Sequence, residues 1–158
     1  MGLVPTLLAI GVGLFLGLRW GGRADNLINW RPPLWEAFVA GFGLVTLLDL
    51  LPWSGPFVAF LRILGLALML GFAAINVRVG GMVLVVAGVG LNLFVTLINW
   101  GLPVNGTALV SAGMVERAEL ARVVLHGGRE VADGSVLAFL GGVLPLPWGQ
   151  VVSVGDLL

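Results

Sequence analysis

Two charged residues, Asp49 and Arg62, stand in stretches that are otherwise apolar, and they are the first candidates for chemistry. An ionisable side chain inside a membrane-crossing helix is costly and marks a functional site by default. Counted from the turn at Ser54, the two residues lie about 7 and about 12 Å deep on a helix. A long arginine could reach back to Asp49 across that turn. The pair is a candidate site, although we favour a structural ion pair, or two groups that snorkel outward.

Three polar residues form a stripe within another apolar stretch. Asn92, Thr96 and Asn99 are spaced at i, i+4 and i+7, so they share one face of a helix. They could line a small polar pocket inside the membrane. Asn and Thr on one helix face more often hydrogen-bond to neighbouring helices, and we favour that interpretation.

The chain has one histidine, His126, and neither cysteine nor tyrosine. His126 could contact a quinone or a pigment at the outer interface. We favour a simpler role, because a position at a helix C-terminus stabilises a positive histidine electrostatically. The absence of cysteine excludes disulfides and thiolate nucleophiles, and one histidine does not suffice for a histidine-based metal cluster. We therefore expect no enzyme, no catalytic residue and no metal; no cofactor is evident, but a bound lipid or quinone is compatible with the sequence.

The composition is that of a membrane protein. Of the 158 residues, 59% are hydrophobic and 10% are charged, against about 25% charged residues in soluble domains. Eight arginines balance eight acidic residues, so no basic excess is present to bind a nucleic acid by counterion release. The expected partners are the lipid bilayer and other membrane protein subunits.

Four stretches are long enough to cross a bilayer as helices, because about 20 apolar residues span its hydrocarbon core. They are Gly2–Leu18, Leu34–Trp53, Pro56–Val77 and Val79–Trp100. Short joints connect the last three, so we expect antiparallel hairpins. The expected fold class is an all-α integral membrane protein, with a four-helix transmembrane bundle over residues 1–100. Small residues that allow close helix packing lie along three of the stretches: Ala9, Gly13 and Gly17, then Ala37 and Gly41, then Gly88.

The placement of arginines gives the expected orientation. Arg19, Arg23 and Arg31 follow the first stretch and Arg78 follows the third, so these joints are assigned to the cytoplasm. The N-terminus and residues 101–150 are then extracytoplasmic. The expected location is the bacterial cytoplasmic (inner) membrane, crossed several times.

Residues 101–150 form a polar, mixed segment after the last long apolar stretch. Asn105 or Thr107 should act as the N-cap of a short helix, which Gly113 should end. A second, amphipathic helix is expected at Val115–Leu125, with an apolar stripe opposite its charged residues. The segment is therefore expected to be helical and to lie outside the membrane.

Two apolar stretches close the chain. Leu137–Trp148 is too short to span and contains prolines, so it should be re-entrant or lie in the interface. Residues 151–158 have the character of a truncated start of a fifth span.

Several motifs occur in a fixed order along the chain. They are Arg19-Trp20-Gly21-Gly22-Arg23 with Asn26-Leu27, Asn99-Trp100-Gly101-Leu102-Pro103-Val104-Asn105, Leu140-Gly141-Gly142-Val143-Leu144-Pro145-Leu146-Pro147, and Val152-Ser153-Val154-Gly155-Asp156. The last three resemble the Asn-x-Gly-Met-Pro-Val-Ser, Leu-Gly-Asp-x-Ile-Pro-Leu-Pro and Phe-Ser-Ile-Gly-Asp motifs of a bacterial family of small polytopic membrane proteins. That family is widespread in actinobacteria and their relatives and has no known function. The resemblance implies a multi-span membrane protein and no activity.

The sequence departs from that family's pattern at three points. Asn105 stands where the family has Ser, and Gly142 stands where it has Asp. If the Asp has a chemical role in the family, this chain has lost it. The family also continues into a fifth span where this chain ends at Leu158, so either the chain is truncated or a partner supplies the remainder.

Taken with the few ionisable groups, these features favour a non-enzymatic accessory or structural subunit of a larger bacterial membrane protein complex. The alternative is a small transporter, or a lipid- or quinone-binding membrane protein with a polar intramembrane pocket. That pocket would use Asp49, Arg62 and the stripe that begins at Asn92.

Overall fold

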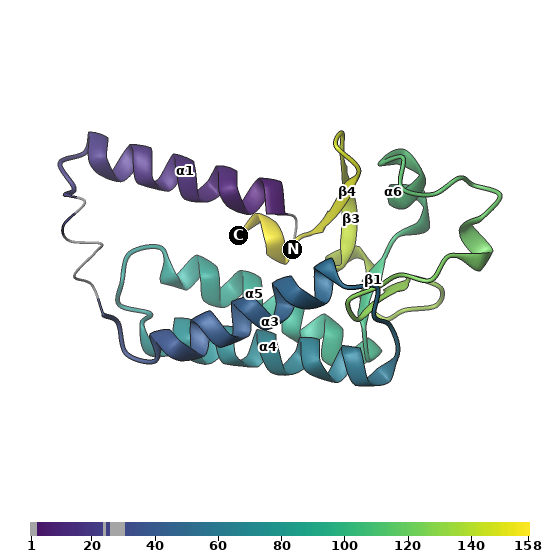
Figure 1. Cartoon of the computed structure of the whole chain (residues 1–158), viewed down its shortest axis with the longest axis horizontal. Coiled ribbons are helices and arrows are strands. Elements are labelled where there is room, and N and C mark those ends of the chain that lie inside the picture. Colours follow the sequence, from purple (N-terminus) through teal and green to yellow (C-terminus); the bar gives the residue numbers. More distant parts are fainter. Residues whose placement is uncertain (1–2, 24, 26–30) are drawn as a thin grey trace.

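The computed structural model describes residues 3–23, 25 and 31–158 of the chain. Gly2 and the Asn26-Leu27 motif lie outside the described residues. Within the described part, long helices come first in the sequence, and a small sheet with short helices follows them (Figure 1).

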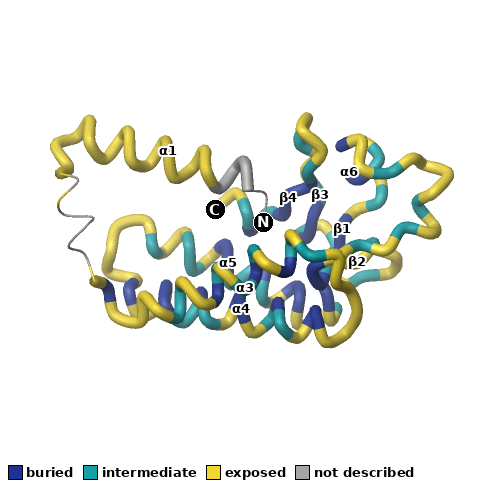
Figure 2. The backbone as a smooth tube through the Cα atoms, in the orientation of Figure 1, coloured by how far each residue is buried: buried dark blue, intermediate teal, exposed yellow. Residues whose placement is uncertain are grey.

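The first helix, α1 (Leu3–Arg19), runs apart from the other helices (Figure 1). Every side chain from Leu7 to Arg19 is exposed, and Figure 2 shows the same for this length of the helix. The sequence of α1 is apolar except for Thr6 and its last residue, Arg19. The rest of the described chain therefore leaves the apolar surface of this helix uncovered from Leu7 to Arg19.

Three helices pack side by side into one layer: α3 (Trp35–Leu50), α4 (Pro56–Ile75) and α5 (Met82–Asn99). α4 packs against both of the others. Their shared core consists of Val45, Leu66, Met69 and Val89, with aromatic and aliphatic neighbours packed around it. Proline at the first position of α4 fits a helix start, where its missing N–H is not needed.

Two glycines allow α3 and α4 to approach closely. A Cβ added to Gly65 would lie 2.7 Å from Cγ2 of Val45, and one added to Gly41 would press on the backbone of Gly65. Of the small residues expected to pack helices, Gly41 thus lies in a helix–helix contact, while Ala37 is half-buried on the same helix.

Two of the described helices, α4 with 20 residues and α5 with 18, are long and apolar enough to cross a membrane by length and composition. α1 has 17 residues and α3 has 16, so the expected four spans are supported only in part. α3 ends at Leu50, short of the expected Trp53, because Pro52 forces Leu51 into an extended conformation (φ −94°, ψ 143°).

Residues 102–153 contain a four-stranded mixed sheet that the sequence did not predict. Its strands are β1 (Leu102–Val104), β2 (Arg129–Val131), β3 (Gly142–Leu146) and β4 (Gln150–Ser153). The strand order is β2-β1-β3-β4, with β1 parallel to both of its neighbours and β4 antiparallel to β3. The all-α expectation is therefore wrong for this part of the chain.

A short helix, α6 (Gly106–Ser111), lies against the sheet. The Asn105 side chain accepts a hydrogen bond from the backbone N–H of Ala108 at 3.1 Å, and Gly113 follows the helix with a φ of +69°. The predicted cap at Asn105 and the predicted end at Gly113 are both confirmed.

The amphipathic helix expected at Val115–Leu125 is wrong. Only a 3-10 turn, η1 (Leu120–Arg122), forms there. Three apolar residues of this stretch, Val115, Leu120 and Leu125, pack on a buried cluster made by the sheet and α6. This packing, rather than a helical period, determines where those side chains lie.

The last two apolar stretches form short strands and 3-10 turns, which the sequence did not predict. Leu137–Trp148 forms a second 3-10 turn, η2 (Ala138–Leu140), and then β3. Residues 151–158 continue β4 and end in η3 (Gly155–Leu157), which packs against α5. Hydrogen bonding to β3 holds residues 150–153 as a strand, so the expected start of a fifth span is wrong.

Candidate functional site

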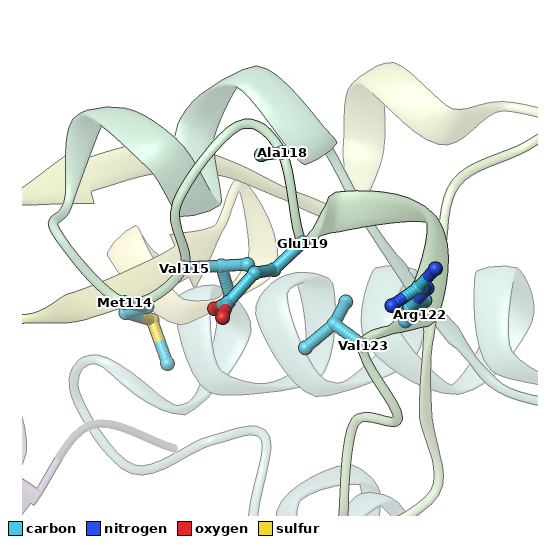
Figure 3. Close-up of a pocket in the computed structure, with 6 residues that line it drawn as sticks. All are labelled: Met114, Val115, Ala118, Glu119, Arg122 and Val123. Atoms are coloured by element: carbon cyan, nitrogen blue, oxygen red, sulfur yellow. The ribbon is translucent and has the colours of Figure 1, made fainter.

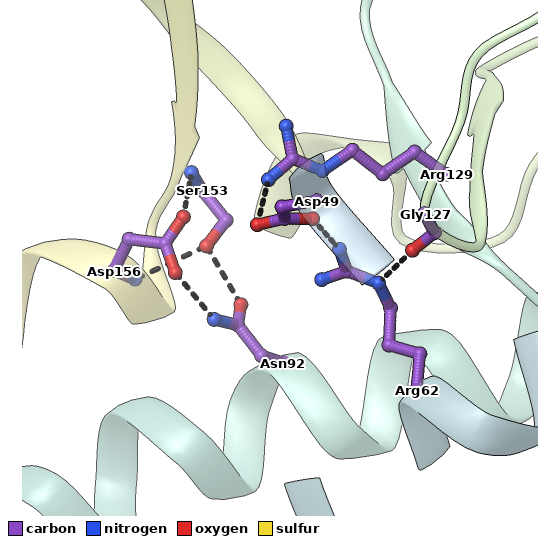
Figure 4. A network of polar contacts seen from close by, with 7 residues as sticks. All are labelled: Asp49, Arg62, Asn92, Gly127, Arg129, Ser153 and Asp156. Carbon is purple, nitrogen blue, oxygen red and sulfur yellow. Dashed lines mark hydrogen bonds and ion pairs between the residues drawn. The ribbon is translucent and has the colours of Figure 1, made fainter. Parts of the chain in front are cut away.

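Two polar networks lie where the helices meet the sheet (Figure 4). In the first, the Asp49 carboxylate of α3 accepts hydrogen bonds from two arginines. Arg62 of α4 donates from Nη2 to Oδ1, and Arg129 of β2 donates from Nη2 to Oδ2 at 3.0 Å. Arg62 Nε also donates to the backbone carbonyl of Gly127. The expected pairing of Asp49 with Arg62 is present, and a third charged residue, Arg129, which the sequence did not indicate, joins it.

This first network is buried. Arg62 is 2% exposed, and the Asp49 side chain is 13% exposed. Removing one member of a buried ion pair leaves an uncompensated charge, which is strongly destabilising. The Asp49 carboxylate and its arginine partners therefore hold their elements together.

A glycine pair brings the segment before β2 onto the helices. Gly127 and Gly128 both have a φ of +71°, which favours glycine. A Cβ on Gly127 would lie 2.9 Å from the carbonyl oxygen of Leu48 and 3.3 Å from Nη2 of Arg62. The N–H of Gly127 donates to the carbonyl of Trp53 at 2.8 Å. Only a residue without a side chain fits this close to the α3–α4 turn.

The second network joins α5 to the end of the chain. Asn92 Nδ2 donates to Asp156 Oδ1 at 2.9 Å, and the Ser153 hydroxyl donates to Asn92 Oδ1 at 2.7 Å. The other Asp156 oxygen accepts from the Ser153 backbone N–H at 3.0 Å. Asn92 and Ser153 are both buried. The carboxamide of Asn92 is therefore used in holding the segment after β4.

Gly88 and Gly155 meet directly beside this network. A Cβ on either glycine would overlap the carbonyl oxygen of the other. The contact lets η3 lie against the backbone of α5, one turn from Asn92. Gly88, expected to pack against another helix, packs instead against the end of this chain.

The other two members of the polar stripe also bond within the chain. Thr96 donates from Oγ1 to the carbonyl of Asn92 at 2.6 Å. Asn99 exchanges two hydrogen bonds with the backbone of Val136, at 2.9 Å from Nδ2 to the carbonyl and 2.8 Å from the N–H to Oδ1. Thr96 therefore bonds within α5 itself, whereas Asn92 and Asn99 bond to residues that follow α5. The favoured hydrogen bonds to neighbouring helices are not the ones that form.

The remaining candidates lie apart from both networks. His126 is exposed and precedes Gly127 in a coil, so no helix C-terminus lies beside it, and the helix-dipole interpretation is wrong. Ala9, Gly13 and Gly17 of α1 are exposed, and nothing lies within 4 Å of a Cβ placed on either glycine. Among the described residues, no group of three or more His, Cys, Asp or Glu could hold a metal ion.

A shallow cavity of about 310 Å³ lies away from the networks, on the segment between α6 and β2 (Figure 3). Met114, Val115, Ala118, Glu119, Arg122 and Val123 line it. Its two ionic side chains come from one exposed turn, and neither has the burial of Asp49 or Arg62. The cavity therefore carries no evident chemistry.

The sequence missed Arg129, Ser153 and Asp156 as members of the site. Arg129 is 80 residues from Asp49, and only the fold brings the two together. Ser153 and Asp156 fall within a motif that the resemblance pointed out, which was the one signal available, although it assigned them no role.

The fold and site define a three-helix layer with a small mixed sheet held on it by buried polar contacts. Residues 28–158 match the family described as "Family of unknown function (DUF5317)", and the chain belongs to this family. The expectation of an uncharacterised family agrees with this match. No curated protein matches the chain, and no solved structure matches it.

Proposed function

We propose that this protein is a non-enzymatic accessory subunit of a bacterial membrane protein complex. The observation that carries the proposal is α1, an apolar helix whose side chains from Leu7 to Arg19 are all exposed. Exposed apolar surface of this extent is stable only in lipid or against another protein.

A membrane location is supported by the helices that follow. α4 and α5 are long and apolar enough to span. α3 packs along α4 and joins it through a short turn, so insertion of α4 would carry α3 across the bilayer with it (Figure 1). With α1, this gives four spans in the proposal.

The orientation follows from one end of the layer. Asn76, at the end of α4, donates from Nδ2 to the carbonyl of Pro33 at 2.9 Å, so the α4–α5 turn meets the start of α3. Arg31 and Arg78 therefore lie at the same end, which the positive-inside tendency assigns to the cytoplasm. The sheet lies at the other end, outside the cell in this proposal.

A subunit role is favoured over chemistry because the polar groups hold the fold. Both oxygens of Asp49 and both polar atoms of the Asn92 side chain bond to residues of this chain. A transporter or quinone-binding protein would need such groups to face a ligand. That alternative has less support, and it predicts that Asp49→Asn and Asn92→Leu abolish transport or quinone binding.

The test is gentle solubilisation of native membranes and purification through a short tag inserted at Gly80, in the exposed α4–α5 turn. The proposal expects a fixed set of membrane proteins to co-purify in constant stoichiometry. Recovery of the protein as a lone monomer contradicts it, and recovery alone with bound lipid or quinone supports the alternative.

A matched pair of variants locates the contact on α1. Gly13→Leu with Gly17→Leu fills one face of the helix and should reduce co-purification several-fold. Gly11→Leu adds one leucine on the opposite face, where nothing lies within 4 Å either, and should leave co-purification unchanged. If the two variants co-purify the same proteins to the same extent, neither face of α1 is a specific protein contact, and lipid surrounds the helix.

A further inference from the structure

We propose that the loop before β3, residues 134–140, docks into the interfacial layer of the outer leaflet, with Val136 and Phe139 as its membrane contacts. The inference rests on the proposed membrane location of α5. It adds a second mode of membrane contact, made by the sheet region and not by a spanning helix.

The loop is held at the depth where α5 ends. Asn99 is the last residue of α5, and its two hydrogen bonds to the Val136 backbone fix the loop beside that helix end. η2, which follows in the loop, also packs against α5. If α5 spans the bilayer, the loop lies at the membrane–water boundary and not above it.

The surface at this point is apolar and exposed. Phe139 is 65% exposed, Val136 is 56% exposed, and Trp100, next after α5, is 50% exposed. Tryptophan and other large apolar side chains at the level of the lipid headgroups form the interfacial belt of membrane proteins. Trp53, at the end of the α3–α4 hairpin and bonded to Gly127, continues the belt on the same side.

The backbone holds the loop in an uncommon conformation. Trp100 and Leu137 both have positive φ values, 56° and 55°, in the region that side chains rarely adopt. Each residue adjoins the Asn99–Val136 contact. Such strain persists only where the surrounding structure enforces it, so the loop is fixed in place and its apolar side chains stay exposed.

Lipid is the occupant that fits this surface best. Residues 134–140 contain no charged side chain, so they offer nothing for a charged protein partner to pair with. The exposed apolar surface of this loop is small, and it lies level with the end of the long apolar helix α5. This geometry suits the headgroup and upper acyl-chain region, where an exposed Phe side chain is removed from water.

The experiment is a depth measurement with single spin labels in phosphatidylcholine–phosphatidylglycerol vesicles. The chain has no cysteine, so each introduced cysteine is a unique labelling site. Labels go to Val136→Cys and Phe139→Cys, and to two reference variants. Phe94→Cys, on the exposed side of α5, reports the bilayer interior, and Ala118→Cys, in the exposed segment between α6 and β2, reports water.

The ratio of collision rates with oxygen and with a water-soluble nickel chelate gives the depth. We expect ratios at 136 and 139 that are several-fold above that of Ala118→Cys and below that of Phe94→Cys. A ratio equal to that of Ala118→Cys overturns the inference. Protection from both reagents also overturns it, because it shows that a second copy of the chain covers the loop.

The two reference variants distinguish a failure of the interfacial docking from a failure of the proposed membrane location. If Phe94→Cys also reads as water-exposed, the proposed membrane location fails. If Phe94→Cys reads as deep and residues 136 and 139 do not, only the interfacial docking fails. Val136→Cys changes an exposed side chain and keeps the backbone contacts to Asn99, so it serves as the second variant should Phe139→Cys fold poorly.

Discussion

Asp49 on α3 and Arg129 on β2 are joined by a hydrogen bond of 3.0 Å between Oδ2 and Nη2, across 80 residues of sequence. This contact connects the helical layer to the sheet, because Arg62 of α4 holds the other oxygen of the same carboxylate. One buried carboxylate thus links three elements. Substitutions around Asp49 should therefore show how the stability of the sheet depends on the helical layer.

Arg129→Met should loosen the sheet from the helices. The variant keeps most of the side chain's length but removes the donor to Asp49, and a hydrogen bond to a charged group contributes about 1.5–3 kcal/mol. We expect a lower midpoint of thermal unfolding in detergent and faster proteolysis between residues 113 and 126. Arg117→Met, an exposed arginine of that segment, is the control. If both variants behave alike, the Asp49–Arg129 contact does not hold the sheet.

Asp49→Asn should be more harmful than Arg129→Met. It leaves two arginines facing each other without their shared counter-charge, and breaking a buried ion pair from one side costs about 3–5 kcal/mol. The measurement is the same unfolding midpoint, with Glu36→Gln, an exposed carboxylate of the same helix, as the control.

The double variant Asp49→Asn with Arg129→Met tests the coupling. It removes one of the two opposed positive charges, so its loss of stability should be less than the sum of the single losses. Strict additivity would mean that the two residues do not act together.

The parts that the sequence predicted are those encoded within a short distance along the chain. Asp49 and Arg62 lie on either side of one turn, and helical geometry alone suggests that they meet. The Asn105 cap depends on residues three apart, which a sequence shows directly. Helix positions followed from apolar runs, although a single proline, Pro52, ended α3 earlier than hydropathy suggested.

The sheet could not be predicted because its strands are three to five residues long, and its central strand β1 pairs with two strands that come much later in the sequence. β1 contains Pro103 and β3 contains Pro145, residues that argue against a strand. Runs so short do not show an alternating pattern. Arg129 was hidden for the same reason, since its partner is set by the pairing of β1 with β2.

Gly88→Ala should displace η3 from α5. The added Cβ would overlap the carbonyl oxygen of Gly155, and neither backbone can move without disturbing the Asn92–Asp156 hydrogen bond. Overpacking of this kind costs about 1–3 kcal/mol, to be measured as a lower unfolding midpoint.

Gly90→Ala is the matched control for that change, on the same helix. Its Cβ would meet only Cδ1 of Leu70, at 3.9 Å. Alanine favours a helix over glycine by about 1 kcal/mol, so this variant should be neutral or slightly stabilising. A loss as large as that of Gly88→Ala would indicate that α5 tolerates no added methyl group, and the contact with η3 would not be special.

Gly127→Ala should lower stability through two separate effects, and a second glycine distinguishes them. Gly134 has nearly the same φ, +70° against +71°, but nothing lies within 4 Å of its added Cβ. Gly134→Ala therefore measures the conformational cost alone, about 1–2 kcal/mol for a non-glycine residue in the left-handed region. At Gly127 the methyl group also meets the Leu48 carbonyl and Arg62, so we expect a larger fall in the unfolding midpoint and increased proteolysis around residue 126. Equal losses at the two positions would mean that the segment before β2 can move off the α3–α4 turn at no further cost, and that Gly127 is required only for its backbone conformation.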